Sequence, residues 1–278
     1  MSIGFSKTFG LEREILSRAL SEFKGSPRLS RSELMSRLGV GSQKAEAMVL
    51  WLGKLGLRDN RQGQLTPLST LLLRYDPYLE DITTLWFLHY QLARNPDAEV
   101  WYVLTNKFLP SRTDFRFADA LNFLVSQGLR TAADKHLKAD VSIFLRAFML
   151  EEGLGKTGFL TAREGEAKMA QRLFHKSPPS ELSPYLVAYA IFDQIMRKSP
   201  NVATVTIKEL LTQDGSVGKV FSLTRSRLEE ILRLISSNQF GHLVDLSTTA
   251  GLDQVGLRFR GGSVQILEMN YRSRAKRS

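Results

Sequence analysis

The stretch that most constrains the fold is "SRSELMSRLGVGSQKAEAMVLWLGKLGL", residues 30–57, in which Gly39-Val40-Gly41 separates two short amphipathic segments. Ser30 with Glu33 three residues later is the pattern of a capping box, which predicts a short helix before the glycines. After the glycines, Ser42 is expected to cap a further helix. The buried residues expected on that helix are Ala45, Met48, Val49, Leu52 and Leu55.

The residues on both sides of this stretch complete a module. "LEREILSRALSEF" (11–23) has the apolar spacing of a helix and precedes the first glycine turn. Leu57 and Leu65 flank a polar segment with Asn60 and Gly63, which predicts a short strand, a turn and a second short strand. Three helices, a tight turn and a basic hairpin in this order predict an N-terminal winged helix-turn-helix over residues 1–75.

Helical periodicity continues through the middle of the chain. Residues 79–109 are rich in aromatic side chains and predict two helices broken at Asn95-Pro96. Further helices are expected over residues 114–128, 131–150, 161–174 and 185–198. We therefore expect a helical middle region over residues 76–200.

The C-terminal part repeats the order of the first module. A short helix is expected over 205–213, and an amphipathic helix over 224–237 with Thr224 as its cap. Residues 242–259 then read as two strands around a turn, and "SVQILEMNY" as a strand before a basic tail. We expect a winged-helix-like α+β module over residues 201–278, in a protein of the mainly α (α+β) class.

The charge favours a polyanionic partner. The chain has 38 Lys and Arg against 28 Asp and Glu, a net charge of +10. The surplus is +5 in residues 1–66 and +4 in residues 201–278, but residues 67–125 carry −2. No cysteine is present, which excludes disulfides and thiolate metal sites. No apolar window approaches a membrane span of about 18 residues and no signal core opens the chain, so we expect a cytoplasmic protein with no membrane partner.

The first module offers DNA contacts on the helix that follows the glycine turn. The N-terminal residues of such a helix enter the major groove, where Gln43 can pair with adenine and Lys44 with guanine or phosphate. The hairpin can follow a neighbouring phosphate or the minor groove. The residues expected to contact DNA here are Ser42, Gln43, Lys44, Lys54, Arg58 and Arg61. The alternative is a module that binds protein, with Leu50 and Trp51 exposed at a protein–protein interface (the seam).

The second module offers a similar set. Arg225 and Arg227 open its amphipathic helix and Lys219 precedes that helix. The terminal run "YRSRAKRS" is either a phosphate-binding arm or a solvated end. The residues expected to contact DNA in this module are Lys219, Arg225, Arg227, Arg272, Arg274, Lys276 and Arg277.

The chain lacks the motifs of common active sites. "GLGKTG" (153–158) follows a predicted helix and has Leu150 where a P-loop needs glycine, so a loop is the expected structure. The four histidines have no metal-ligand spacing, and His89 is expected to be a hydrogen-bonded core residue. We expect no catalytic residue, metal or cofactor. Because carboxylates distant in sequence can converge in space, a nuclease stays an open alternative.

Several segments, in order, resemble the domain of unknown function 4007 family of bacteria and archaea. They are "FSKTFGLEREILSRAL", "RSELMSRLGVGSQKAEAMVLWLGKLGL", "DPYLEDITTLWFLHYQLARNP", "ADVSIFLRAF", "FSLTRSRLEEIL" and "TTAGLDQV". The third is the most distinctive, with Asp81, Thr84-Leu85-Trp86 and Leu88-His89 matching in place. The opening departs from the family because no histidine precedes its Thr-Phe. The resemblance covers nearly the whole chain and brings no catalytic residues.

The resemblance implies an association with DNA phosphorothioation and related phage-defence systems. Together with the basic modules, it leads us to expect a non-enzymatic accessory subunit that binds double-stranded DNA and the protein subunits of a modification or restriction assembly. Two alternatives stay open. One is a protein–protein adaptor in that assembly, with the 79–109 aromatics as part of its seam, and the other is a transcriptional regulator of its own operon.

Overall fold

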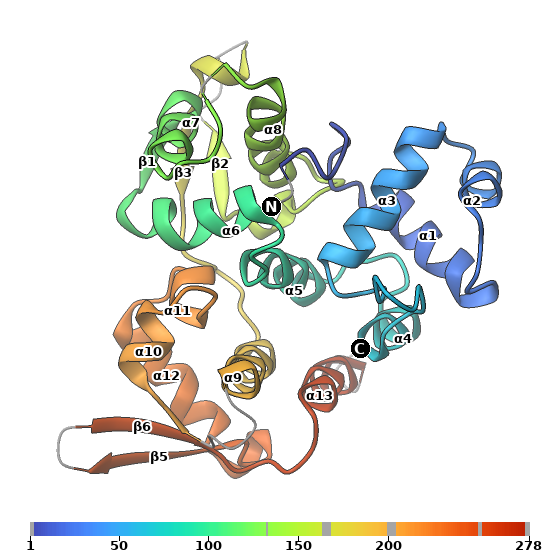
Figure 1. Ribbon diagram of the computed structural model, residues 1–278. Coiled ribbons are helices and arrows are strands. Elements are labelled where there is room, and N and C mark those ends of the chain that lie inside the picture. Colours follow the sequence, from blue (N-terminus) through green and yellow to red (C-terminus); the bar gives the residue numbers. More distant parts are fainter. Residues whose placement is uncertain (1–2, 132, 163–167, 199–203, 250–251, 276–278) are drawn as a thin grey trace. The chain divides into compact units, whose positions relative to one another are not determined.

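The computed structural model describes residues 3–131, 133–162, 168–198, 204–249 and 252–275 (Figure 1). The chain divides into two compact units, Met1–Ser180 and Glu181–Ser278, and each is described by itself. This division differs from the three predicted segments. The segment predicted as a winged helix-turn-helix and most of the predicted middle region belong to one unit, and the last predicted helix of the middle region begins the second.

The first unit begins with three helices and a fourth that follows a turn: α1 (Arg13–Gly25), α2 (Arg31–Leu38), α3 (Ser42–Lys54) and α4 (Pro67–Tyr75). The predicted capping box is confirmed, because Ser30 accepts from the Glu33 N–H and Glu33 accepts from the Ser30 N–H. Gly39 ends α2 at φ 65°. Gly41 rather than Ser42 is the N-cap of α3. The predicted hairpin is reduced to one isolated antiparallel bridge, between Arg58 and Leu65. A single bridged pair is too short to form two strands.

The rest of the first unit is built around a buried helix. That helix, α5 (Ile82–Ala93), has every residue from Thr83 to Ala93 buried. The other helices of this part are α6 (Glu99–Val103), the π-helical η1 (Leu104–Phe108), α7 (Phe117–Ser126) and α8 (Lys135–Met149), with 3-10 turns η2 (Leu109–Ser111), η3 (Gly155–Thr157) and η4 (Met169–Gln171). The predicted break at Asn95-Pro96 is therefore confirmed.

A small sheet also belongs to the first unit. It contains β1 (Asp114–Arg116), β2 (Leu160–Ala162) and β3 (Leu173–Lys176), antiparallel in the order β1-β3-β2. The prediction of helix over 161–174 is wrong where the structure describes this segment, and residues 163–167 lie outside the described residues. The prediction of helix over the first residues of 114–128 is also wrong. These strands are three or four residues long, and pairing between distant segments stabilises them. Phe115 and Phe174 stack across β1 and β3 with ring centroids 5.6 Å apart.

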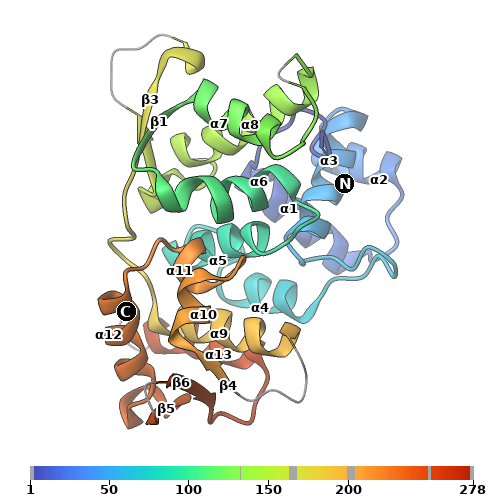
Figure 2. The ribbon, with the colours of Figure 1, turned by 60° about the vertical axis from the view of Figure 1, so that its left-hand side comes forward.

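The second unit combines helices with a second sheet (Figure 2). Its helices are α9 (Pro184–Lys198), α10 (Ile207–Thr212), α11 (Val217–Val220), α12 (Arg225–Ile235), the 3-10 turn η5 (Asn238–Phe240) and α13 (Ser263–Ala275). Its strands β4 (Thr204–Thr206), β5 (Val244–Thr249) and β6 (Leu252–Leu257) form an antiparallel sheet in the order β4-β6-β5. The predicted strand pair over 242–259 is confirmed.

The C-terminal segment is a helix, so the strand predicted for "SVQILEMNY" is wrong. Ile266, Leu267 and Tyr271 are buried, a spacing that fits one face of a helix, and α13 packs against α9. Among the described residues, no helix is long and apolar enough to span a membrane.

Candidate nucleic-acid interface

Helix α12 presents apolar residues on one side and arginines on the other. Leu228, Ile231, Leu232 and Ile235 are buried, as predicted from their spacing. The side chain of Thr224 accepts a hydrogen bond from the Arg227 N–H at 3.3 Å, so the predicted cap is confirmed. This cap fixes the start of the helix, and with it the positions of the arginines in the first turn.

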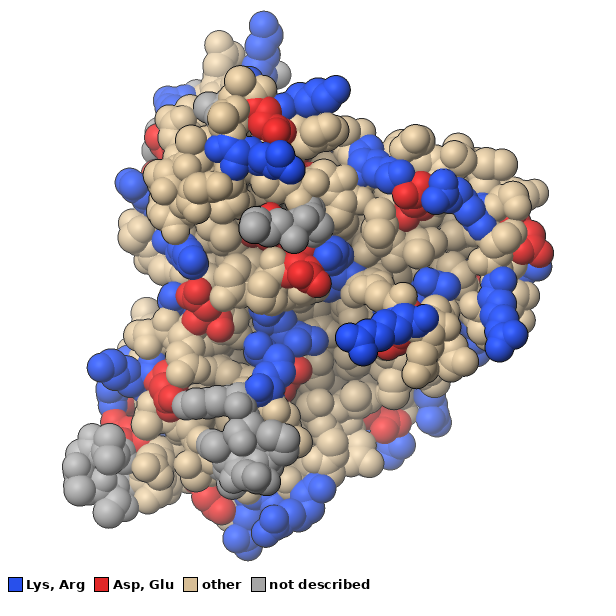
Figure 3. All heavy atoms as spheres, in the orientation of Figure 1, with Lys and Arg blue, Asp and Glu red and all other residues tan. Residues whose placement is uncertain are grey.

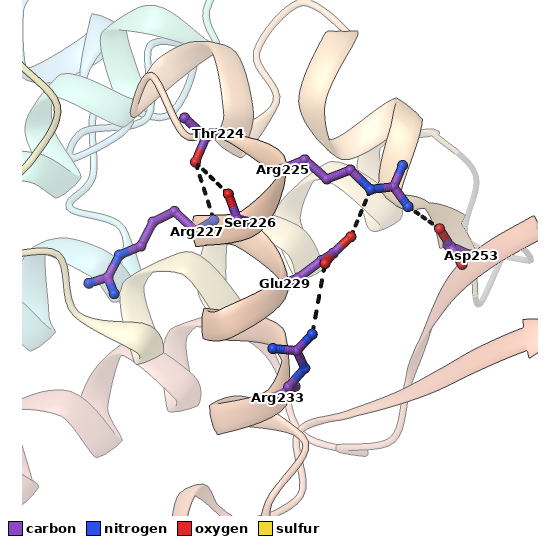
Figure 4. Close-up of polar contacts among 7 residues, drawn as sticks. All are labelled: Thr224, Arg225, Ser226, Arg227, Glu229, Arg233 and Asp253. Atoms are coloured by element: carbon purple, nitrogen blue, oxygen red, sulfur yellow. Dashed lines mark hydrogen bonds and ion pairs between the residues drawn. The ribbon is translucent and has the colours of Figure 1, made fainter.

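One carboxylate holds two of these arginines (Figure 4). The Nε of Arg225 donates to Glu229 at 2.7 Å, and an Nη of Arg233 lies 3.8 Å from the other oxygen of Glu229. Arg225 also donates to Asp253 on β6. The carboxylates of Glu229 and Asp253 raise the pKa of the Arg225 guanidinium above its usual value. The arrangement is an Arg–Glu–Arg chain along the helix, attached to the hairpin by Asp253.

Arg227 lies on a different side of α12. Figure 4 shows its side chain extending away from the β5–β6 hairpin, whereas Arg225 extends toward it. Arg227 pairs with Glu230 at 2.6 Å, and both side chains are exposed. The helix therefore offers arginines on two sides of its exposed surface.

A groove of about 300 Å³ lies between α12 and the β5–β6 hairpin. Its apolar lining includes Ile207, Leu232 and Leu246, and Leu246 is 43% exposed. Its charged lining consists of Arg225, Glu229, Arg233 and Asp253. The charged groups that bind one another in Figure 4 are thus the groups that a ligand in this groove would meet.

The other predicted contacts in the second unit lie outside this groove. Lys219 on α11 pairs with Asp214 at 2.6 Å. Arg272 pairs with Glu268 at 2.8 Å, and Arg272 and Arg274 are exposed in the last turns of α13. Lys276 and Arg277 lie outside the described residues.

In the first unit, the lysines of α3 are engaged in contacts within the unit. Lys44 pairs with Glu12 at 2.6 Å and lies over the Phe9 ring. Lys54 is 14% exposed and lies over the Phe5 ring, and burial lowers the pKa of its ammonium. The predicted polar contacts Ser42 and Gln43 are exposed at the start of α3.

The two arginines of the 58–65 turn differ. Arg58 lies 4.5 Å from the centroid of the Phe23 ring, and burial lowers the pKa of its guanidinium. Arg61 is exposed at the tip of the turn. The Asp59 carboxylate accepts from the N–H groups of Arg61 and Gln62, which fixes that tip. Of the predicted hairpin cations, only Arg61 is fully exposed in this part of the described chain.

Trp51 is a core residue, so the expectation that it is exposed is wrong. It is 1% exposed and its Nε1–H donates to the Phe9 carbonyl at 3.1 Å. Its ring meets Phe5 and Trp101 edge to face, with centroids 4.8 Å and 6.2 Å away. Trp51 departs from the α3 apolar stripe because it packs against the N-terminal segment and α6. Its neighbour Leu50 is half-buried.

Acidic side chains accompany the basic ones over the surface. On the face drawn in Figure 3, Lys and Arg side chains lie among Asp and Glu rather than in one broad basic patch. Glu46 on α3, for example, pairs with both Lys7 and Arg31. Binding of a polyanion would therefore depend on which arginines can leave their carboxylates.

The remaining motifs have structural roles. His89 is fully buried and its Nδ1 accepts from the Trp101 Nε1–H at 3.1 Å, as predicted for a core histidine. The segment "GLGKTG" follows helix α8 and contains the turn η3, so no strand precedes it. In the described part of the chain, no group of three or more His, Cys, Asp or Glu side chains is placed to hold a metal ion.

Three charged residues of the groove were absent from the predicted DNA contacts. Arg233 and Glu229 could have been found, since the spacing of Arg225, Glu229 and Arg233 is i, i+4, i+8 on one helix. Asp253 could not have been found, because only the hairpin brings it to the start of α12.

Comparison with known proteins supplies the family and the fold. The family model described as protein of unknown function (DUF4007) matches residues 6–271. A crystal structure of SspB described as bound to a magnesium ion has a TM-score of 0.78 at 19% identity, covering 99% of this chain and 87% of that chain. A second SspB crystal structure has a TM-score of 0.76 at 20% identity, with the same coverage. No curated protein matches. The SspB likeness shows the fold alone, and the family match shows that this chain belongs to the DUF4007 family.

Proposed function

We propose that this protein is a non-enzymatic accessory subunit that binds double-stranded DNA for a DNA sulfur-modification or related phage-defence assembly. The observation that carries the proposal is α12, which exposes three arginines beside an antiparallel hairpin. The link to sulfur modification and defence rests on the family resemblance.

The order of elements in the second unit supports a winged helix. A short strand, three helices and a two-stranded hairpin follow one another as β4, α10, α11, α12, β5 and β6. In helix-turn-helix proteins, the helix after the turn is the one that enters the major groove, with its N-terminal residues at the bases. In this proposal α12 is that helix and the β5–β6 hairpin is the wing.

The side chains on α12 suit phosphate and guanine. Arg225 and Arg227 lie in its first turn, and arginine binds both phosphate oxygens and the guanine edge with two parallel hydrogen bonds. Contacts with phosphate would supply most of the affinity and make it depend on salt. The net charge of +10 favours the same partner.

The first unit has a smaller part in this proposal. Its helices α1, α2 and α3 follow one another like α10, α11 and α12 of the second unit. However, its cations make contacts within the unit: Lys44 with Glu12, Lys54 with Phe5 and Arg58 with Phe23. Ser42, Gln43 and Arg61 are exposed and would be its contacts with DNA.

Fluorescence anisotropy of a labelled duplex of arbitrary sequence, plain and phosphorothioated, tests the proposal across a salt series. We expect binding that weakens steeply with salt, and at least a tenfold loss in the Arg225→Ala/Arg227→Ala variant. Lys135→Ala/Lys138→Ala is the charge-matched control, because both lysines are exposed on α8 in the first unit. No binding at low salt would overturn the proposal, and equal losses in both variants would remove α12 from the interface.

An adaptor function is the second candidate, and exposed apolar side chains favour it. Leu234 on α12 is 38% exposed, Leu246 on β5 is 43% exposed and Tyr78 is 71% exposed. The seam first expected, Trp51 with the 79–109 aromatics, is largely core. An adaptor would bind DNA weakly alone and form a stable complex with the product of a neighbouring gene.

Two further measurements distinguish the remaining alternatives. A strong preference for one palindromic site near its own promoter would indicate an operon regulator, in place of an accessory subunit. Nicking of plasmid DNA by the purified protein with a divalent cation would indicate a nuclease. That assay is worthwhile because one SspB structure of this fold is described as bound to magnesium.

A further inference from the structure

We infer that Glu229 competes with DNA phosphate for Arg225 and Arg233, so that duplex binding at the groove between α12 and the hairpin exchanges one carboxylate for phosphate. This inference rests on the proposed function and identifies Glu229 as a residue that limits the affinity for duplex DNA. In this groove two arginines and the carboxylate that they share lie beside open space.

The geometry makes Glu229 the centre of the cluster. Its two oxygens receive different arginines, Arg225 from the preceding turn at 2.7 Å and Arg233 from the following turn at 3.8 Å (Figure 4). The Glu229 side chain is 29% exposed, whereas those of Arg225 and Arg233 are 56% and 72% exposed. A carboxylate thus lies beneath two guanidinium groups that solvent, or a ligand, can reach.

Phosphate and carboxylate bind a guanidinium in the same way. Both accept paired N–H donors through oxygens that carry negative charge, so one replaces the other with little change of geometry. Exposed ion pairs on a helix are weak, which allows this replacement. Asp253 holds Arg225 from the hairpin side and would compete for that arginine as well.

The exchange leaves Glu229 close to the DNA backbone without its partners. Repulsion between that carboxylate and phosphate opposes binding, and a cation taken up beside it offsets part of the counterion release that DNA binding produces. The wild-type protein should therefore bind duplex more weakly, and with a shallower dependence on salt, than its arginines alone would allow.

The test compares duplex binding by wild type, Glu229→Gln and Glu181→Gln in the full chain across a salt series. Glutamine keeps the length of the side chain and removes its charge. Glu181→Gln is the matched control, since Glu181 is exposed in the same unit and does not line the groove. We expect Glu229→Gln to bind about ten times more tightly at low salt, with a log–log salt slope steeper by about one. Asp253→Asn should also bind the duplex more tightly than wild type, but with a smaller gain in affinity than Glu229→Gln.

A second variant ties the gain to the arginines. The gain from Glu229→Gln should disappear when Arg225→Ala and Arg233→Ala are present, as a double-mutant cycle requires for groups that act together. A purely structural role for Glu229 would lower affinity in Glu229→Gln, the opposite sign.

The outcomes separate this inference from the proposed function. Equal affinities for Glu229→Gln, Glu181→Gln and wild type, with loss in Arg225→Ala/Arg227→Ala, would overturn the inference and leave DNA binding in place. Absence of duplex binding by both wild type and Glu229→Gln at low salt would overturn both.

Discussion

The backbone N–H of Gly4 donates a 2.6 Å hydrogen bond to the carboxylate of Asp140, a residue 136 positions later in the chain. Asp140 lies on α8 and is 7% exposed, so this bond attaches the N-terminal segment to the core of the first unit. Burial raises the pKa of the Asp140 carboxyl to about 6, although the bond from Gly4 and the charge of His136 lower it. The folded protein therefore disfavours the charged form of this residue.

Asp140→Asn is expected to stabilise the first unit at pH 8 and not at pH 4. A carboxyl whose pKa is higher in the folded state costs stability as pH rises from 3.8 through about 6, and the full cost is present above that range. Asparagine keeps an oxygen for the Gly4 N–H without the charge. We expect a gain of about 1–3 kcal/mol at pH 8.

Urea unfolding followed by tryptophan fluorescence measures this difference. Trp51, Trp86 and Trp101 are the three tryptophans and all lie in the first unit, so the signal reports that unit. The variant and wild type should converge as the pH falls below 5. A loss of stability at pH 8 would show that the charged hydrogen bond outweighs the desolvation of the carboxylate.

Gly153→Ala is expected to destabilise the first unit by about 1–3 kcal/mol, the usual range for overpacking. A Cβ at this position would lie 2.5 Å from the Ala147 carbonyl oxygen and 3.1 Å from its Cα, both backbone atoms of α8. Gly25→Ala is the control, because no atom lies within 4 Å of a Cβ there. The same fluorescence measurement applies, and equal midpoints in the two variants would contradict the packing argument.

Thr224→Ala should loosen the start of α12. The lost hydrogen bond to the Arg227 N–H is an N-cap contact, worth about 1 kcal/mol. Hydrogen exchange measured by mass spectrometry should show faster exchange in the first turn of α12, and Thr224→Ser should restore the wild-type rate. Unchanged protection in Thr224→Ala would mean that tertiary packing alone fixes this turn.

Neutralising arginines of α12 should weaken DNA binding more than neutralising cations of the first module. Lys44→Ala/Arg61→Ala removes one lysine that pairs with Glu12 and one exposed arginine. Arg225→Ala/Arg227→Ala removes two exposed arginines. Both double variants should bind all DNA sequences more weakly and show a shallower log–log salt slope. The slope should fall by about one unit more in Arg225→Ala/Arg227→Ala, which corresponds to one more lost phosphate contact. A larger effect of Lys44→Ala/Arg61→Ala would move the main interface to α3.

Periodicity and capping chemistry predicted α1, α2, α5 and α12 correctly, but they placed a helix over 161–174 where β2 and β3 lie and missed the helix α13. The capping box at Ser30 and the Thr224 cap form from neighbours within about one turn of helix, and the apolar stripe of α12 follows from helical spacing although other elements such as α9 bury it. The hydrogen-bonded core role of His89 was also predicted, although its donor, Trp101, was not. Local sequence therefore fixed these elements because their stabilising partners are close in the chain.

Tertiary structure decided what local patterns could not. The strands of the first sheet are too short to have a period, and they exist because β1 and β2 both pair with β3. Trp51 is buried by residues from outside α3, and the α12 groove needs Asp253 from the hairpin. The sequence by itself determined the basic charge, most of the helices and the arginines of α12. Only the folded chain decided which cations meet carboxylates from distant segments, such as Lys44 with Glu12 and Arg225 with Asp253, because the sequence does not contain those distances.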